Sequence, residues 1–371
     1  FVTSGFSLAP ADNDQTGTSV AHLVNQGWSN GTDYFFRFYT INNPGSGSET
    51  FTVGNFVQVN PYSTSGMGNV VPQSGTATGL QGNDPRLGGG AYMRRNPVTG
   101  TWTLVTSHHF GPVALRSRFY EFDNMGGATP TLRQQGNLGS GAGRNYWFPS
   151  VAMNGQGHIV MASSASDSGI FASVNVAARL VNDTLGNLTF NNIAFAGLAK
   201  YVKDFGSGQN RWGDYSETCV DPNDNQTFWA FQTYAEAQVS GWDRWGVRVV
   251  KVLAPPPATI STLSPASITQ GQTASITVTG TSTSGSGFYD PGTGFANRIA
   301  AAFSGSGLTV NSVTFVSPTS LTLSVTASAG AATGARNLTV TNPDGQSTTL
   351  NSAITVNAGS STPTVSSLTP N

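Results

Sequence analysis

A hairpin that recurs along the first two thirds of the chain is the feature that most limits how this sequence can fold. Each copy has an apolar-alternating run, a short turn rich in Gly, Asn, Asp or Pro, and a second alternating run, which is the pattern of two antiparallel strands. The copies follow one another at intervals of roughly sixty to seventy residues, a period typical of repeat architectures. The turns of the four copies lie at residues 29–31, 96–100, 155–157 and 221–225.

Further strand-like runs follow each hairpin, so that each repeat has about four strands, the number in a blade of a β-propeller. Blades stack around a central channel because a single blade cannot bury both of its faces. The 45 Gly and 19 Pro residues, and the lack of a long stretch of helix-forming residues, favour short strands and tight turns. The sequence therefore predicts an all-β protein, with a β-propeller of four legible blades over residues 1–253.

The fourth hairpin and the residues before it read RWGDYSETCVDPNDNQTFW, residues 211–229. This stretch resembles the signature near the end of sialidase-like β-propeller domains in large secreted bacterial proteins. The turns in DPNDNQTFW and NPVTGTWTL are similar to the Asp-box hairpin of sialidases, which has a structural role. The resemblance implies six blades, some of them divergent in the early part or absent from this piece, and it implies no particular activity.

A change of composition at residue 254 marks a second region. Residues 254–258 include three consecutive prolines and predict a stiff linker. Residues 259–357 have short alternating runs between Ser-Pro, Gly-Gln and Asn-Pro-Asp-Gly turns, which predict a β-sandwich. They resemble the IPT/TIG class of immunoglobulin-like domains, with an insertion at 281–300 that predicts a surface loop. Residues 358–371 predict a linker and the start of a further IPT/TIG repeat.

Charge and cysteine content narrow the classes of function. Only 9% of residues are charged and the net charge is −1, so no nucleic-acid partner is expected. No apolar run is long enough for a membrane span. The single cysteine, Cys219, allows no internal disulfide and no multi-cysteine zinc site. Low charge with many Ser, Thr, Asn and Gly residues is typical of an exported bacterial protein. We therefore expect an extracellular or cell-surface location, with a leader removed or with Phe1 inside a longer chain.

A polar cluster at the start of the fourth hairpin is the candidate catalytic site. Arg211, Asp214, Tyr215 and Glu217 precede or begin an inner strand, which would place them at one rim of the channel. An Arg, a Tyr and two carboxylates suit sialidase-like glycoside hydrolysis, with Tyr as nucleophile and Arg holding a sugar carboxylate. The favoured alternative is that Arg211 and Asp214 form a buried structural pair, because no three-arginine motif of sialidases is recognisable.

Aromatic residues near the rims are the candidate ligand-binding residues. Trp212 and Tyr215 precede the fourth hairpin beside Arg211, and Tyr146 and Trp147 precede the third. The ligand would be a glycan or a protein, or the rim would serve self-association.

The turn of the fourth hairpin is the weak candidate for a metal site. Asp221 and Asp224 offer carboxylate oxygens of the kind that calcium prefers. The loop lacks the fuller ligand set of a known calcium motif, so turn formation is the favoured role. We expect no cofactor, with a structural calcium as the alternative.

Two functions follow as hypotheses. In the first, the protein is an extracellular structural or adhesive component, with the propeller as a binding or assembly module on an immunoglobulin-like stalk and without catalysis. In the second, it is a secreted sialidase-like glycoside hydrolase with immunoglobulin-like spacer domains. The two differ in whether Arg211, Asp214 and Tyr215 line an open pocket or are buried against each other.

Overall fold

The computed structural model describes residues 7–13, 19–64, 67, 68, 70–82, 85–111, 114–127, 129–140, 143–203 and 208–359. The chain divides into two compact units, Phe1–Leu253 and Ala254–Asn371. The division falls where the sequence analysis places the start of the linker. The further repeat predicted at 358–371 lies almost wholly outside the described residues.

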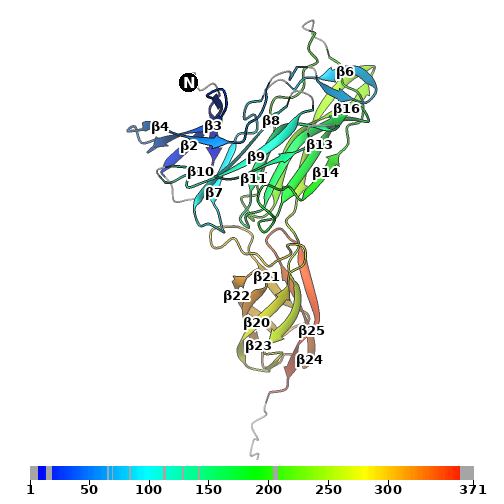
Figure 1. Ribbon diagram of the computed structural model, residues 1–371. Helices are drawn as coiled ribbons and strands as arrows, with labels where there is room; N and C mark the ends of the chain where they lie inside the picture. Colours follow the sequence, from blue (N-terminus) through cyan, green and yellow to red (C-terminus); the bar gives the residue numbers. More distant parts are fainter. Residues whose placement is uncertain are drawn as a thin grey trace, which may run out of the picture. The chain divides into compact units, whose positions relative to one another are not determined.

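Strands and turns make up the described parts of both units, and no helix occurs there (Figure 1). The all-β prediction is therefore confirmed. No helix among these residues is long and apolar enough to cross a membrane. The strands of the first unit are β1 (Ala9–Asp12), β2 (Val20–Ser29), β3 (Tyr34–Asn42), β4 (Thr50–Val59), β5 (Val71–Gln73), β6 (Thr76–Leu80), β7 (Ala91–Arg95), β8 (Trp102–Phe110), β9 (Arg116–Asp123), β10 (Thr131–Leu138), β11 (Asn145–Met153), β12 (Ile159–Asp167), β13 (Ile170–Arg179), β14 (Phe190–Phe195), β15 (Glu217–Val220), β16 (Phe228–Val239) and β17 (Trp242–Val252).

The second, third and fourth predicted hairpins each begin an antiparallel meander, whereas the first forms the middle two strands, β2 and β3, of its meander. The strand orders are β1-β2-β3-β4, β7-β8-β9-β10, β11-β12-β13-β14 and β15-β16-β17, so the fourth meander has three strands where four were expected. The first two meanders join into one eight-stranded sheet, because Ala11 and Asp12 of β1 pair in parallel with Ala91 and Tyr92 of β7. The order of strands along the chain follows the predicted repeat.

Side chains on the facing surfaces of the first two meanders form one core. Phe36 and Phe38 of β3 share a buried cluster with Tyr120 and Phe122 of β9. The ring centroids of Phe36 and Tyr120 are 4.5 Å apart, a spacing at which aromatic rings attract one another. The eight-stranded sheet therefore curls so that β2 and β3 lie over the meander of β7–β10.

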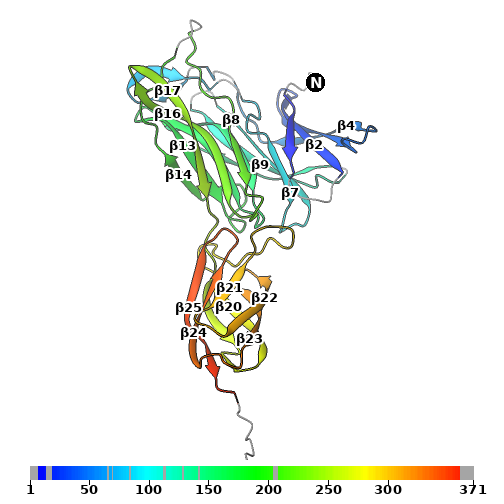
Figure 2. The same cartoon turned by 180° about the vertical axis from the view of Figure 1, so that it is seen from behind.

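The later meanders continue this packing. Phe119 of β9, Met161 of β12 and Phe228 of β16 belong to one buried cluster, which includes residues of the second, third and fourth meanders. Figure 2 shows the sheets β7–β10, β11–β14 and β15–β17 following one another through the unit. Burial of side chains on both faces of strands such as β11 and β12 is the main source of stability in such a unit, since apolar burial contributes about 25 cal/mol per Å².

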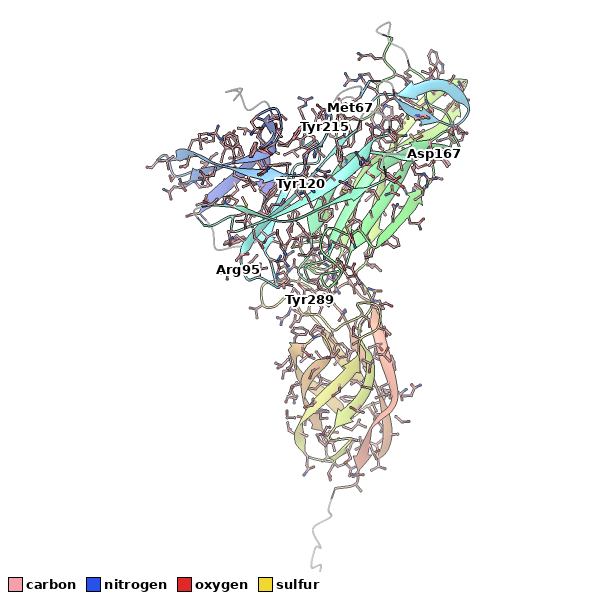
Figure 3. All side chains as sticks on the ribbon, viewed as in Figure 1. Met67, Arg95, Tyr120, Asp167, Tyr215 and Tyr289 are labelled. Carbon is pink, nitrogen blue, oxygen red and sulfur yellow. The ribbon has the colours of Figure 1, made fainter. Side chains whose placement is uncertain are left out.

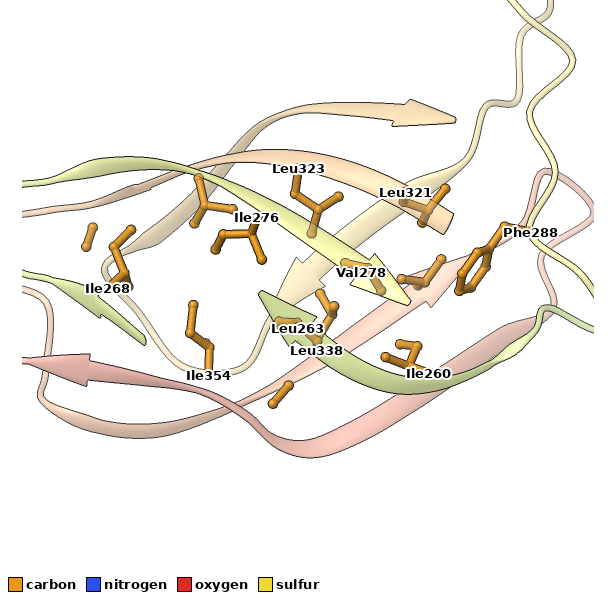
Figure 4. Close-up of a cluster of buried hydrophobic side chains, with 14 of the residues drawn as sticks. Ile260, Leu263, Ile268, Ile276, Val278, Phe288, Leu321, Leu323, Leu338 and Ile354 are labelled. Atoms are coloured by element: carbon orange, nitrogen blue, oxygen red, sulfur yellow. The ribbon is translucent and has the colours of Figure 1, made fainter. Parts of the chain in front are cut away.

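The second unit has two four-stranded sheets around one core (Figure 4). Every second residue of β23 is buried, which is the pattern of a strand with one face toward a core. The sheets have the orders β18-β20-β23-β22 and β19-β25-β24-β21. Their strands are β18 (Thr259–Ser264), β19 (Ser267–Thr269), β20 (Thr273–Thr281), β21 (Ala300–Phe303), β22 (Leu308–Ser317), β23 (Ser320–Ala327), β24 (Gly334–Thr341) and β25 (Ser347–Asn357).

The insertion at 281–300 is anchored in this core, so the prediction of a plain surface loop was wrong in part. Phe288 is 1% exposed and packs in the core cluster, as labelled in Figure 4. Its backbone N–H donates to the carbonyl of Pro318, 2.8 Å away. An aromatic side chain within a Gly- and Ser-rich insertion is the local signal for such an anchor, because its burial offsets the entropy of ordering the loop.

The proline segment, which the sequence analysis predicts to be a stiff linker, is bonded to the second unit. Ala258 is fully buried in the core cluster. The carbonyl of Pro256 accepts from the N–H of Gly287 at 2.9 Å, and the carbonyl of Ala254 accepts from the side chain of Gln346 at 2.8 Å. Proline lacks an N–H but keeps its carbonyl, so this segment accepts hydrogen bonds along its length. Residues 254–258 therefore belong to the second unit.

Candidate functional site

An open pocket of about 470 Å³ in the first unit contains the residues before the fourth hairpin. It lies between residues 201, 203 and 211–215 on one side and the strands β16 and β17 on the other. The lining residues are Tyr201, Lys203, Arg211, Trp212, Gly213, Asp214, Tyr215, Thr233, Trp245 and Val247. The structure thus brings together Arg211, Trp212, Asp214 and Tyr215, as the open-site hypothesis requires.

Glycines position the backbone of the signature segment. A Cβ atom on Gly88 would lie 2.6 Å from the carbonyl oxygen of Asp214, so only glycine allows the two chains to approach this closely. A Cβ atom on Gly213 would lie 2.9 Å from the Thr233 hydroxyl oxygen. The Ser216 hydroxyl donates to the Phe148 carbonyl at 2.8 Å. The segment is therefore held against the loop before β7 and against β11 and β16, which leaves its charged side chains at the surface.

Arg211 and Asp214 form an ion pair with 2.6 Å between Nη2 and Oδ2. The side chain of Arg211 is 55% exposed and that of Asp214 is 29% exposed. The expectation of a buried structural pair was therefore wrong. The two residues are three positions apart in a surface segment, so they form an ion pair while both side chains remain partly exposed to water.

We expect Arg211→Ala to change stability little, because an exposed ion pair contributes about 0.2–1 kcal/mol. The free energy of unfolding, measured by urea denaturation, should fall by less than about 1 kcal/mol. Asp214→Ala is the matched variant and should behave alike. A loss of about 3 kcal/mol or more in both variants would contradict the exposed arrangement.

Two of the candidate ligand-binding residues, Tyr146 and Trp147, are core residues. Trp147 has no exposed surface, and Tyr146 is 7% exposed with its hydroxyl accepting from the Asn191 amide at 3.2 Å. Both lie on β11, where all nine residues are buried because other meanders cover both faces of the strand. They therefore support the fold, and the prediction that they contact a ligand was wrong.

Trp212 lines the pocket although most of its side chain is buried. It is 4% exposed, and its indole N–H donates to the Ser164 hydroxyl at 3.0 Å. Its ring packs edge-on against Tyr201, with centroids 5.2 Å apart. Trp212 and Tyr201 therefore make a rigid floor for the pocket.

Exposed aromatic side chains form the walls. Tyr215 is 73% exposed and lies at the surface of the first unit (Figure 3). Trp245 is 54% exposed on β17, opposite Ala235 of β16. The sequence analysis missed Trp245 and Val247, although the alternation of Trp245, Val247 and Val249 along one strand was a usable signal. These walls offer flat apolar surfaces beside the Arg211–Asp214 ion pair.

Glu217 begins β15 and lies outside the lining of this pocket. Although the residue as a whole is exposed, partial removal of its carboxyl group from water and, to a smaller extent, the negative charge of Asp12 together raise its pKa to about 7. A carboxyl group with such a pKa is partly protonated at neutral pH. It could therefore act as a general acid.

The oxygens of Asp221 and Asp224 are used within the turn. Asp224 Oδ1 accepts from the N–H groups of Gln226 and Thr227, each at 2.8 Å. Asp221 Oδ2 accepts from the indole N–H of Trp229 at 3.0 Å. In the described parts of the chain no group of three or more His, Cys, Asp or Glu side chains is placed to hold a metal ion. These bonds explain both aspartates as turn-forming residues.

No family model and no curated protein matches the sequence. Among solved structures, a protein of unknown function from Dyadobacter fermentans DSM 18053 aligns over 83% of this chain and 72% of its own, with a TM-score of 0.30 and 8% identity. An N-acetylgalactosamine deacetylase from F. plautii, solved in complex with blood group B trisaccharide, aligns over 64% of this chain and 74% of its own, with a TM-score of 0.28 and 8% identity. Likenesses this distant carry no inference about the activity of the chain.

Proposed function

We propose that this protein is an extracellular structural or adhesive component whose first unit binds a glycan. In this proposal the first unit is a sialidase-like β-propeller module, and the second is an IPT/TIG immunoglobulin-like spacer. The RWGDYS segment, the repeated meanders and the low charge of the chain support these assignments. The proposal assigns no catalysis to the protein.

The observation that carries the proposal is the pocket between the signature segment and β17. Ligand sites are typically concave and mostly apolar, with a few polar groups that orient the ligand. The rings of Tyr215 and Trp245 offer faces to the C–H side of a sugar ring, while the Arg211–Asp214 pair offers donors and acceptors to hydroxyl groups. A glycan fits this combination better than a purely apolar ligand does.

Trp245→Ala should weaken sugar binding by the first unit at least about tenfold, which corresponds to about 1.4 kcal/mol. Lactose, N-acetylglucosamine and N-acetylneuraminic acid are suitable probes, with binding followed by saturation-transfer NMR and titration. Trp242→Ala is the matched control, because Trp242 is 71% exposed on the same strand and does not line the pocket. Equal loss in both variants, or binding unchanged by Trp245→Ala, would contradict the proposal.

A second candidate function is glycoside hydrolysis, which the two carboxyl groups of Glu217 and Asp12 favour. Glycosidases commonly pair one protonated carboxyl group, whose pKa is raised, with one ionised carboxylate. Since partial removal from water and the neighbouring Asp12 raise the pKa of Glu217 to about 7, Glu217 would be the acid and Asp12 the second carboxyl group of the pair.

For the hydrolase, Glu217→Gln should abolish turnover of 4-methylumbelliferyl glycosides. Turnover by the parent protein should fall as the pH rises through about 7, because a general acid must carry its proton. Asp33→Asn, at a partly exposed carboxylate elsewhere, is the control. Absence of turnover by the parent protein, or turnover that survives Glu217→Gln, would remove this candidate.

A further inference from the structure

The fourth meander ends in an edge strand, β17, which pairs with a neighbour on one side. The first three meanders have four strands each, whereas the sheet β15-β16-β17 ends at β17. Along its 11 residues β17 pairs with β16 alone among the described strands. Its outer edge therefore presents backbone N–H and C=O groups in a row, which is a template for another strand.

The two faces beside this edge differ in chemistry. On one face Trp245, Val247 and Val249 are 54%, 54% and 47% exposed. On the other face stand two arginines, Arg244 and Arg248, both exposed. Side chains alternate along a strand, so a strand added at this edge beside residues 244–249 would meet apolar groups on one side and positive charge on the other.

We propose that the free edge of β17 binds an extended segment of a partner protein in which apolar and acidic residues alternate. The acidic residues would lie beside Arg244 and Arg248, and the apolar ones would extend the surface of Val247 and Val249. Backbone hydrogen bonds provide the affinity in this mode of recognition, and the alternate side chains provide the specificity. This goes beyond glycan binding, because the contacts run along the strand edge and the partner is a polypeptide.

In the registers that pair most of the strand, the positions of the arginines disfavour a second copy of β17 as the occupant. In an antiparallel pair of two copies centred on Gly246, Arg244 would stand opposite Arg248. Centring the pair on Arg248 would place two copies of this residue opposite each other. Centring it on Val247 leaves both copies of Arg248 close together on one face. Like charges at such positions destabilise a sheet.

Each arginine already has a contact within the unit, and this contact still allows it to bind an acidic neighbour. Arg248 lies over the ring of Phe195, with its guanidinium carbon 4.5 Å from the centroid, and this contact fixes its direction without neutralising its charge. Arg244 pairs with Glu236 at 2.7 Å and is 45% exposed, so it keeps N–H groups for a second carboxylate.

The test uses the full chain and two synthetic peptides of about ten residues, one alternating Val with Glu and one alternating Val with Lys. We expect the Glu peptide to bind and to slow hydrogen exchange of the backbone amides of residues 242–252. The Lys peptide should bind at least about tenfold more weakly. Arg248→Glu should reverse this preference. If the melting temperature shows that this variant does not fold, Arg244→Glu is the second variant.

Three results would overturn the proposal. They are equal binding of the two peptides, failure of the Glu peptide to bind, and protection of amides outside residues 242–252. Sedimentation of the chain alone provides a further check, since a dimer that Val247→Lys dissociates would assign this edge to a second copy.

Discussion

Trp147→Ala should lower the free energy of unfolding of the first unit by about 3–5 kcal/mol. Trp147 is fully buried, and its ring lies in a cluster with Leu115, Ala172, Tyr201 and Trp212. Removal of the indole leaves a cavity that β11, covered on both faces, cannot collapse to fill. The indole N–H has no hydrogen-bond partner among the described residues, so the loss comes from packing.

The matched control is Trp242→Ala, which removes the same side chain from a position that is 71% exposed. Surface substitutions usually change stability by less than about 0.5 kcal/mol. Urea denaturation followed by circular dichroism measures both variants. Equal losses would show that Trp147 is not a core residue and would reopen its assignment as a ligand contact.

Arg133→Ala should also destabilise the first unit strongly, by about 3 kcal/mol at neutral pH. Arg133 Nε lies 3.2 Å from Oε1 of Glu121, whose side chain is 1% exposed. The same oxygen accepts from the Asn96 amide at 2.8 Å, and the Gln134 amide donates to the other oxygen. Arg133→Ala removes a positive charge beside the buried carboxylate of Glu121, while the hydrogen bonds from the Asn96 and Gln134 amides remain.

The effect of Arg133→Ala should depend on pH. Burial raises the pKa of Glu121 above its ordinary value, despite the opposing effects of Gln134 and Arg133. A raised pKa in the folded state favours the protonated form. The contribution of Glu121 to the free energy of unfolding therefore falls as the pH rises from the pKa of the unfolded state through that of the folded state. Without Arg133 the pKa rises further. The penalty of the substitution should therefore shrink as the pH falls toward the ordinary pKa of Glu, near 4.3.

Arg144→Ala is the control for this prediction. Arg144 pairs with Asp167 at 2.9 Å, and both side chains are partly exposed, at 36% and 23%. Its loss should cost less than about 1 kcal/mol. A penalty of Arg133→Ala that grows at acid pH, or that equals the penalty of Arg144→Ala, would contradict the buried-carboxylate interpretation.

The sequence by itself determined the strands and their turns. Alternating apolar runs and Gly, Asn, Asp and Pro turns are local signals, so the turns predicted at 96–100, 155–157 and 221–225 each lie between two paired strands. The boundary near residue 254 was also legible, since a proline cluster interrupts the strand pattern. The convergence of Arg211, Trp212, Asp214 and Tyr215 follows from their nearness along the chain.

Only the tertiary structure decided which side chains are buried. Trp147 and Trp245 both lie on strands with aromatic neighbours, yet one is fully buried and the other is 54% exposed. The difference arises because other sheets cover both faces of β11, whereas the face of β17 that carries Trp245, Val247 and Val249 is left exposed. The exposure of the Arg211–Asp214 pair and the parallel pairing of β1 with β7 depend in the same way on segments far apart in sequence. Local periodicity shows which face of a strand is apolar, but packing between distant segments determines whether that face is covered.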